Sequence, residues 1–113
     1  MKNAIVTLFV MLFVAGCSNK KENLKDAQFR VWGNCDMCKK TIETSINALP
    51  TIYSANWNTE TKLIKVEFDS VKTNLEEIQK KIAAVGYDTE KVKGNDTAYL
   101  QLHACCQYER RKE

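Results

Sequence analysis

The sequence predicts an α+β fold whose elements follow the order strand, helix, strand, strand, helix, strand. Apolar residues alternate with polar ones in several short runs, which is typical of strands with one buried face. Two longer stretches instead repeat apolar residues every three or four positions, as amphipathic helices do. The whole chain has 113 residues, which leaves room for one domain with a modest core.

Residues 1–16 are predicted to be an export signal and not part of that domain. Lys2 gives a basic start, residues 4–14 are apolar except for Thr7, and two small residues follow. This apolar run is too short for a membrane span, which needs about 20 residues, but it suits a signal peptide. The stretch ending in Cys17, Val-Ala-Gly-Cys, resembles a bacterial lipobox, so we expect lipidation at Cys17. The alternative is an ordinary signal peptide followed by an incidental cysteine.

Residues 17–26 are polar and rich in lysine, and they predict a flexible tether between lipid and domain. This places the chain in the cell envelope as a lipid-anchored protein that faces the periplasm or the cell surface, with the outer membrane preferred. Cleavage before Cys17 leaves 97 residues of net charge +2, because Lys2 is the only charged residue lost. Acids and bases alternate without a basic stripe, which excludes nucleic acid as an expected partner.

The predicted domain, residues 27–94, begins with a strand and a helix. The apolar positions of the strand are Ala27, Phe29 and Val31. The apolar stripe of the helix is Cys38, Ile42, Ile46 and Leu49, and Pro50 ends it.

Two more alternating runs follow, at residues 53–57 and 64–68, and residues 58–61 read as a hairpin connection. The second helical stripe is Leu75, Ile78, Ile82 and Val85, with Thr73 or Asn74 as N-cap and Gly86 at the end. A weak extended segment at 89–93 would be the last strand. This order is the split βαβ, or ferredoxin-like, βαββαβ sandwich, in which two helices cover one face of an antiparallel sheet.

Residues 95–113 form a predicted C-terminal helical tail. Asp96 could cap a helix that carries Tyr99, Leu102 and Cys106 on one face. His103 and Cys106 would share a helix face, whereas Cys105 would point about 100° away from Cys106.

A Cys-x-x-Cys pair, Cys35 and Cys38, lies between the first strand and the first helix. The positive end of the helix dipole favours thiolates there, and Lys39 and Lys40 would act in the same direction. Thiolates bind soft metal ions. Cys38 lies on the core stripe, so Cys35 should be the more exposed thiol and the first to meet a metal. The alternative is a disulfide that forms by default after export.

The number of remaining cysteines does not decide between metal binding and disulfide formation. Of five cysteines, Cys17 is assigned to the lipobox, and four remain. An even number in an exported protein usually indicates disulfides. Neither close pair can join distant segments, however, unless the two pairs meet.

A Cys-x-x-Cys after the first strand of a βαββαβ pattern resembles the heavy-metal-associated domain family, which includes copper chaperones and periplasmic mercury-binding proteins. The resemblance covers about residues 27–93. Gly86-Tyr87-Asp88 matches the family's usual Gly-Tyr or Gly-Phe before the last strand. The resemblance implies that Cys35 and Cys38 are the ligands, that Tyr87 lies near them, and that metal efflux or resistance proteins are the partners. The family usually reads Gly-Met-Thr-Cys where this chain has Trp-Gly-Asn-Cys at 32–35.

Other residues near the pair have weaker functional readings. Met37 could donate its thioether to Cu(I), although an ordinary exposed methionine is the favoured interpretation. His103, Cys105 and Cys106 are candidate additional ligands, and we predict that His103 with Cys105 or Cys106 completes a three- or four-coordinate site. Packing of Cys106 as a small apolar residue is the alternative.

The sequence therefore predicts a binding protein and not an enzyme. It would carry or sequester one soft ion, with Cu(I) favoured and Hg(II) or Zn(II) as alternatives. A thiol-disulfide oxidoreductase that uses Cys35 and Cys38 is the rival class, but thioredoxin-like enzymes place a cis-proline opposite the thiols, and Pro50 is the only proline in the chain. A structural zinc site that joins tail to domain is the third hypothesis.

Overall fold

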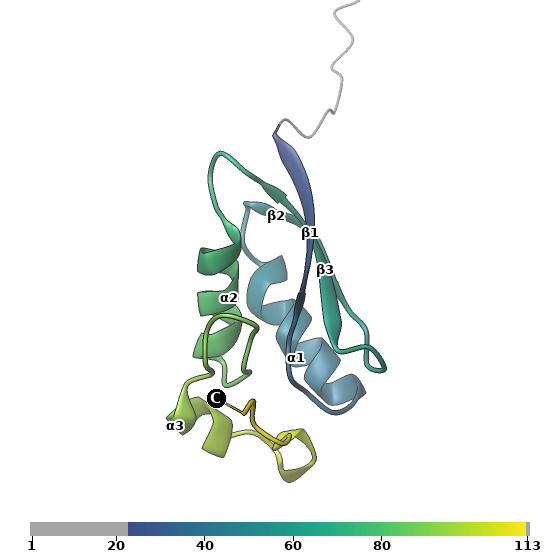
Figure 1. Ribbon diagram of the computed structural model, residues 1–113, viewed down its shortest axis with the longest axis vertical. Coiled ribbons are helices and arrows are strands. Elements are labelled where there is room, and N and C mark those ends of the chain that lie inside the picture. Colours follow the sequence, from purple (N-terminus) through teal and green to yellow (C-terminus); the bar gives the residue numbers. More distant parts are fainter. Residues whose placement is uncertain (1–22, 113) are drawn as a thin grey trace, which may run out of the picture.

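The computed structural model describes residues 23–112, which fold into a three-stranded antiparallel sheet with two helices on one face (Figure 1). The sheet has the strand order β1-β3-β2. The main elements are β1 Leu24–Arg30, α1 Asp36–Asn47, β2 Ile52–Trp57, β3 Leu63–Asp69 and α2 Leu75–Ala84. This α+β arrangement confirms the predicted ferredoxin-like class. The predicted signal peptide, Cys17 and the tether up to residue 22 lie outside the described residues.

The core forms where the predicted stripes meet. Cys38, Ile42 and Ile46 of α1 have no exposed surface. They pack with apolar side chains of the sheet and of α2, namely Phe29, Ile64, Val66, Phe68, Ile78 and Ile82. Full burial of each such side chain contributes about 1.5–3 kcal/mol, so the predicted periodicities identify the residues that hold the fold together.

The first strand begins earlier than predicted. β1 pairs with β3 from Leu24, opposite Asp69, through Arg30, opposite Leu63. Residues 24–26 therefore belong to the sheet, where the sequence predicts a tether. Their side chains are exposed, so backbone pairing with β3, and not an apolar pattern, extends the strand.

The second helix begins and ends as predicted. Asn74 is its N-cap, and the side-chain oxygen of Asn74 accepts a hydrogen bond from Glu77 N at 3.0 Å. Gly86 follows the helix with a φ of +105°, a conformation that residues with a Cβ rarely adopt. A Cβ at Gly86 would also lie 2.8 Å from Tyr99 N, so the tail packs directly against this glycine.

The predicted last strand at 89–93 is wrong. Within residues 23–112 this segment contributes a single bridge, between Val31 and Thr89. The chain then turns back, because Thr89 N donates to Val92 O at 2.8 Å. Gln79 of α2 fixes the turn, since its Oε1 accepts hydrogen bonds from Thr89 Oγ1 and Lys91 N. These bonds occupy backbone groups that a longer strand would use.

The predicted long tail helix is also wrong. Helix α3 spans only Asp96–Leu100, with Asn95 and not Asp96 as its side-chain cap. A separate 3-10 turn, η1 Ala104–Cys106, follows. Past the end of α3, the side-chain amide of Gln107 donates to the carbonyls of Leu100 and Leu102, both at 3.3 Å, in place of the backbone N–H groups that a longer helix would supply. His103 and Cys106 therefore do not share a helix face.

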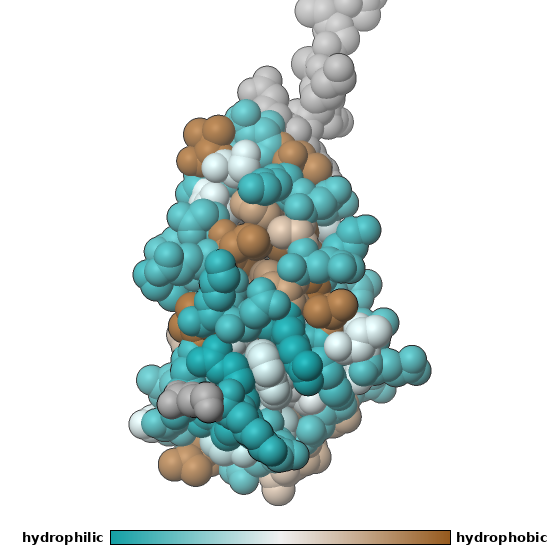
Figure 2. Space-filling view, in the orientation of Figure 1, coloured by the Kyte–Doolittle hydropathy of each residue, from teal (hydrophilic) through white to brown (hydrophobic). Residues whose placement is uncertain are grey.

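The surface is largely polar. Figure 2 shows a predominantly hydrophilic face with scattered hydrophobic side chains. The large exposed apolar residues come from separate elements and are Leu24, Met37, Val71 and Leu100. Within residues 23–112, no helix is long and apolar enough to cross a membrane.

Candidate metal site

The Cys-x-x-Cys pair lies where the loop after β1 becomes α1. Cys35 is the N-cap residue, and Cys38 is the third residue of the helix. Cys35 is half-buried and Cys38 is fully buried, as the core stripe predicted. The backbone N–H of Asn34 points at Cys38 Sγ at 3.4 Å, so the loop directs its positive backbone dipoles toward this sulfur.

The surroundings of Cys38 favour its thiolate form. Burial opposes ionisation, but hydrogen bonds from the backbone of Cys35 and Asn34, and the polar groups of the neighbouring Cys106 and Tyr87 side chains, hold the pKa of Cys38 below its usual value. Burial and the neighbouring Cys38 raise the pKa of Cys106 to about 12. Cys38 is therefore the first of these two thiols to ionise as the pH rises, while Cys106 keeps its proton near neutral pH.

A tryptophan supports the loop from below. Trp57 is fully buried, and its indole Nε1 donates to Val31 O at 3.0 Å. Gly33 lies so close to this ring that an added Cβ would be 3.1 Å from it and 3.3 Å from Cys38 Cβ. Trp57 thus fills the space beneath the loop that precedes Cys35, and a larger residue at position 33 would have to displace the Trp57 ring or Cys38 by a few tenths of an ångström.

The cation next to the loop is not the one that the sequence suggested. Lys39 directs its ammonium toward the end of β2, where it bonds Glu43 at 2.8 Å and Trp57 O at 2.7 Å. This geometry gives Lys39 a structural role and not contact with the thiols, and Lys40 is exposed. Lys62 instead reaches the loop, donating to Asn34 O at 3.1 Å. Sequence spacing gave no signal for Lys62, which comes from the β2–β3 hairpin.

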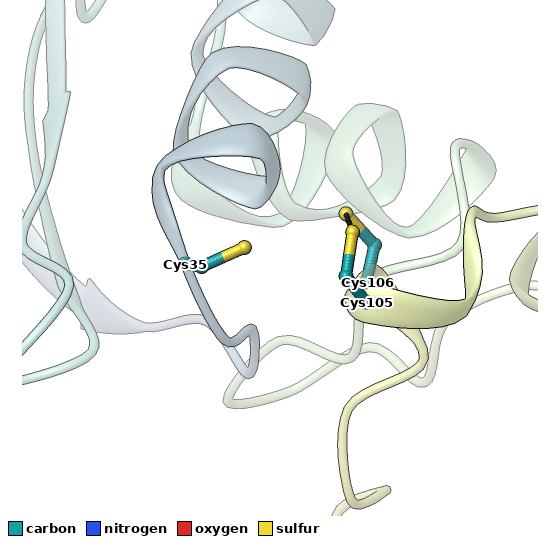
Figure 3. Close-up of side chains that lie close together, drawn as sticks. All are labelled: Cys35, Cys105 and Cys106. Carbon is teal, nitrogen blue, oxygen red and sulfur yellow. Dashed lines mark hydrogen bonds between the residues drawn. The ribbon is translucent and has the colours of Figure 1, made fainter.

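The tail brings two more thiols to this loop. The Sγ atoms of Cys35, Cys105 and Cys106 all lie within 4.8 Å of one another. Figure 3 shows Cys35 at the start of α1 and the tail pair pointing toward the same space. Cys38 contacts Cys106 from the buried side, and the Met37 thioether lies 3.7 Å from Cys105 Sγ. All four cysteines in the described part of the chain are free thiols.

His103 is not part of this sulfur group. Its side chain is exposed, and its backbone oxygen accepts the hydrogen bond from Cys106 N that starts the 3-10 turn. The two predicted tail cysteines therefore approach Cys35, but a turn, and not a shared helix face, brings them there. Asn34 also holds the turn, since its side-chain amide donates to Cys105 O at 3.1 Å.

Tyr87 lies beside the thiols, as the resemblance implied. Its ring is fully buried and stacks on Tyr108, with centroids 5.5 Å apart. Burial and the neighbouring Cys38 raise the pKa of Tyr87. Among residues 23–112 its hydroxyl has no hydrogen-bond partner. Tyr87 therefore contributes an apolar ring and one unsatisfied hydroxyl to the space behind Cys38 and Cys106.

A buried ion pair fastens the tail to the domain. Asp88 is fully buried and accepts from Arg110 Nη2 at 2.7 Å, Arg110 Nε at 2.9 Å and Arg111 N at 2.9 Å. Burial raises the pKa of Asp88, but the bonds from Arg110, Arg111 and Gly94 outweigh that effect and hold it below its usual value. Tyr108 adds two bonds, donating to Gly86 O at 2.6 Å and accepting from Asp88 N at 2.7 Å. We call these contacts of Asp88, Tyr108, Arg110 and Arg111 the tail clasp.

Comparison with known proteins identifies the family to which the domain around Cys35 and Cys38 belongs. Residues 31–88 match the heavy-metal-associated domain, which is just over half of the chain. The chain belongs to the heavy-metal-associated domain family. Both Cys35 and Cys38 lie within the matched residues, whereas the tail with Cys105 and Cys106 lies outside them.

Individual members of the family are similar over most of their length. The copper chaperone CopZ of Staphylococcus saprophyticus is 32% identical over 57 residues, which cover 50% of this chain and 84% of CopZ. The structure of oxidised MerP from Ralstonia metallidurans aligns with a TM-score of 0.56 at 25% identity, covering 59% of this chain and 94% of MerP. The N-terminal domain of the zinc(II) ATPase ZiaA aligns with a TM-score of 0.53 at 31% identity, covering 80% of this chain and 83% of that domain.

Proposed function

We propose that this chain is a carrier for one soft heavy-metal ion, which Cys35 and Cys38 bind first. The observation that supports this most strongly is the pair itself, with one half-buried thiol and one buried thiol whose ionised form is stabilised. Thiolates are the ligands that Cu(I) and other soft ions prefer. Binding and release, and not catalysis, is the activity that such a pair supports in this family.

Cu(I) is the favoured cargo. It accepts low coordination numbers with thiolate ligands, whereas structural Zn(II) sites are almost always four-coordinate. Similarity to a protein named a copper chaperone supports this choice. Hg(II) and Zn(II) are the alternative cargoes. A structural zinc site between tail and domain is the alternative function, in which the ion is not transferred.

Transfer would proceed by ligand exchange with a partner that also presents thiolates. An incoming thiolate forms a bond to the ion as the bond to Cys35 or Cys38 breaks, so the ion never becomes free. A metal-transport ATPase of an efflux or resistance system is the proposed partner. Similarity to the N-terminal domain of a zinc(II) ATPase supports this, because two domains of one fold can bring equivalent loops together.

The proposed location is the cell envelope, with Cys17 as the lipid anchor. One acyl chain binds a membrane only weakly, so stable anchoring needs the several chains of a bacterial lipoprotein. Cys17→Ser is expected to move the protein from the membrane fraction to the soluble fraction of a cell lysate. Unchanged fractionation would refute the anchor and leave the metal-binding proposal intact.

Native mass spectrometry of the reduced chain, offered Cu(I), Hg(II) and Zn(II) in competition, tests the cargo. We expect one bound ion, with Cu(I) or Hg(II) displacing Zn(II). Retention of Zn(II), together with loss of the fold when Zn(II) is removed, would indicate a structural site instead. Reduction of insulin disulfides above the background of dithiothreitol would favour the oxidoreductase alternative.

A further inference from the structure

We propose that Cys35, Cys105 and Cys106 form a second metal-binding arrangement, a three-thiolate site that exists only while the tail is docked. This proposal rests on the proposed function, because Cys35 is shared with the Cys35–Cys38 pair. The tail would thereby convert a two-thiolate carrier into a three-thiolate store. The matched family residues include Cys35 but neither tail cysteine, since they end at residue 88.

The distances between the sulfurs suit one ion. With metal–sulfur bonds of about 2.3 Å, three sulfurs around one ion lie about 4.0 Å apart. The three Sγ atoms already lie within 4.8 Å of one another, and those of Cys105 and Cys106 are 3.9 Å apart. The separations therefore need to shorten by less than about 1 Å for the three sulfurs to hold one ion.

The tail is held in place by contacts on both sides of the turn that carries the thiols. After the turn, Tyr108 and the two arginines form the tail clasp with Asp88. Before the turn, α3 packs on Gly86, and Asn95 N donates to Ala83 O at 2.8 Å. The hydrogen bond from Asn34 to Cys105 O then joins the turn directly to the loop of Cys35. This arrangement positions the thiols before any metal arrives.

The ligand set selects the chemical class of the ion. Three thiolates, with the Met37 thioether 3.7 Å from Cys105 Sγ, provide sulfur only, and this favours Cu(I) and other soft ions over Mg(II) or Ca(II). His103 is exposed and outside the group, so we assign it no ligand role.

Passage of the ion between the two arrangements needs only ligand exchange. Cys35 stays bound, bonds from Cys105 and Cys106 to the ion form, and the bond from Cys38 breaks. The two tail thiols release their protons to water, Cys38 takes one proton from water, and no atom changes oxidation state. Cys38 contacts Cys106, so the outgoing and incoming sulfurs are already neighbours. With the tail docked, the ion is covered, and opening of the tail returns it to the pair that a partner can reach.

Copper K-edge X-ray absorption on the full chain with one equivalent of Cu(I) tests the proposal, using a Cys17→Ser background to remove the fifth thiol. We expect three sulfur ligands in this background and two after Cys105→Ser. Cys105 is exposed, so this change leaves the core untouched, and unchanged circular dichroism and melting temperature would verify that. His103→Ala is the matched control and should keep three sulfurs. Chelator competition should show about tenfold weaker Cu(I) binding for Cys105→Ser alone.

Two sulfurs in the parent, or three in both the parent and Cys105→Ser, would overturn the three-thiolate site. Either result would leave the proposed carrier function standing, because Cu(I) would still be bound. Failure of the parent to bind Cu(I) at all, in contrast, would overturn Cu(I) as the cargo of the carrier and the three-thiolate site together.

Discussion

The two cysteine pairs of this chain are positioned by different kinds of structure. Cys35 and Cys38 are fixed by one local element, the start of α1, which sets their separation through helical geometry. Cys105 and Cys106 are adjacent on a three-residue 3-10 turn that has little stability of its own. Their position depends on the tail clasp, in which Tyr108 and the two arginines that follow the turn contact Asp88, before α3. One pair is therefore a property of local sequence, and the other is a property of the folded domain.

This difference suggests different roles. A locally formed pair keeps its geometry when the tail moves, which suits transfer of an ion to a partner. A pair held by a clasp can leave the site as a unit, which suits a ligand arm that adds and removes affinity. Substitutions that alter one region at a time can therefore separate the two roles.

The largest effect is expected from the local pair. Cys35→Ser with Cys38→Ser should abolish tight binding of Cu(I), because Cys35 belongs to both proposed sulfur arrangements. Titration with Cu(I) against a competing chelator measures this, and circular dichroism checks that the fold persists. Binding equal to that of the unmodified chain would contradict the assignment of these ligands.

The next effect concerns the tail clasp. Asp88→Ala should lower the free energy of unfolding by about 3 kcal/mol, because it leaves Arg110 and the buried Gly94 N–H without their partner. Asp96→Ala is the matched control, since Asp96 contacts the same guanidinium but its side chain is 72% exposed, and it should cost less than about 1 kcal/mol. Urea denaturation measures both. Equal losses in the two variants would show that the buried pair does not fasten the tail.

Acid should weaken the same clasp by a smaller amount. The folded-state pKa of Asp88 lies below its usual value, because the bonds from Arg110, Arg111 and Gly94 outweigh the effect of burial. Its contribution to stability is therefore fully present above the unfolded pKa of about 4 and is lost as the pH falls through the folded pKa. Asp88→Ala should show a shallower loss of stability than the unmodified chain below about pH 4. Parallel pH profiles for the two proteins would contradict this prediction.

The smallest expected effect is a difference in stability between variants of the two stacked tyrosines, Tyr87 and Tyr108. Tyr108→Phe removes a hydroxyl with two hydrogen bonds, to Gly86 O and from Asp88 N, and should cost about 1–2 kcal/mol. Tyr87→Phe removes a buried hydroxyl for which residues 23–112 offer no partner, so it should be neutral or slightly stabilising. Thermal melts of both variants provide the comparison. A larger loss for Tyr87→Phe would reverse the assigned roles.

The local region could be predicted from sequence, and the tertiary region could not. The stripe of Cys38, Ile42 and Ile46 fixes α1, and the Cys-x-x-Cys spacing then fixes both thiols. The prediction of a last strand was wrong because Lys91 N donates to the Gln79 side chain and not to a neighbouring strand. Apolar periodicity does not reveal such a contact. The prediction of a long tail helix was wrong because its apolar spacing fits a helix, whereas α3 ends at Leu100, whose carbonyl accepts from the Gln107 side chain. Pairing of Asp88 with Arg110, 22 residues away, leaves no signal in residue spacing.

Protection of individual thiols from alkylation tests most directly whether the two regions meet at one ion. The Cys17→Ser chain is reduced, loaded with one equivalent of Cu(I), and treated with an alkylating reagent, and its peptides are then resolved by mass spectrometry. We expect the alkylating reagent to modify Cys35 and both tail cysteines more slowly when Cu(I) is bound than when it is absent. Protection confined to Cys35 and Cys38, with Cys105 and Cys106 reacting at their metal-free rates, would contradict this expectation.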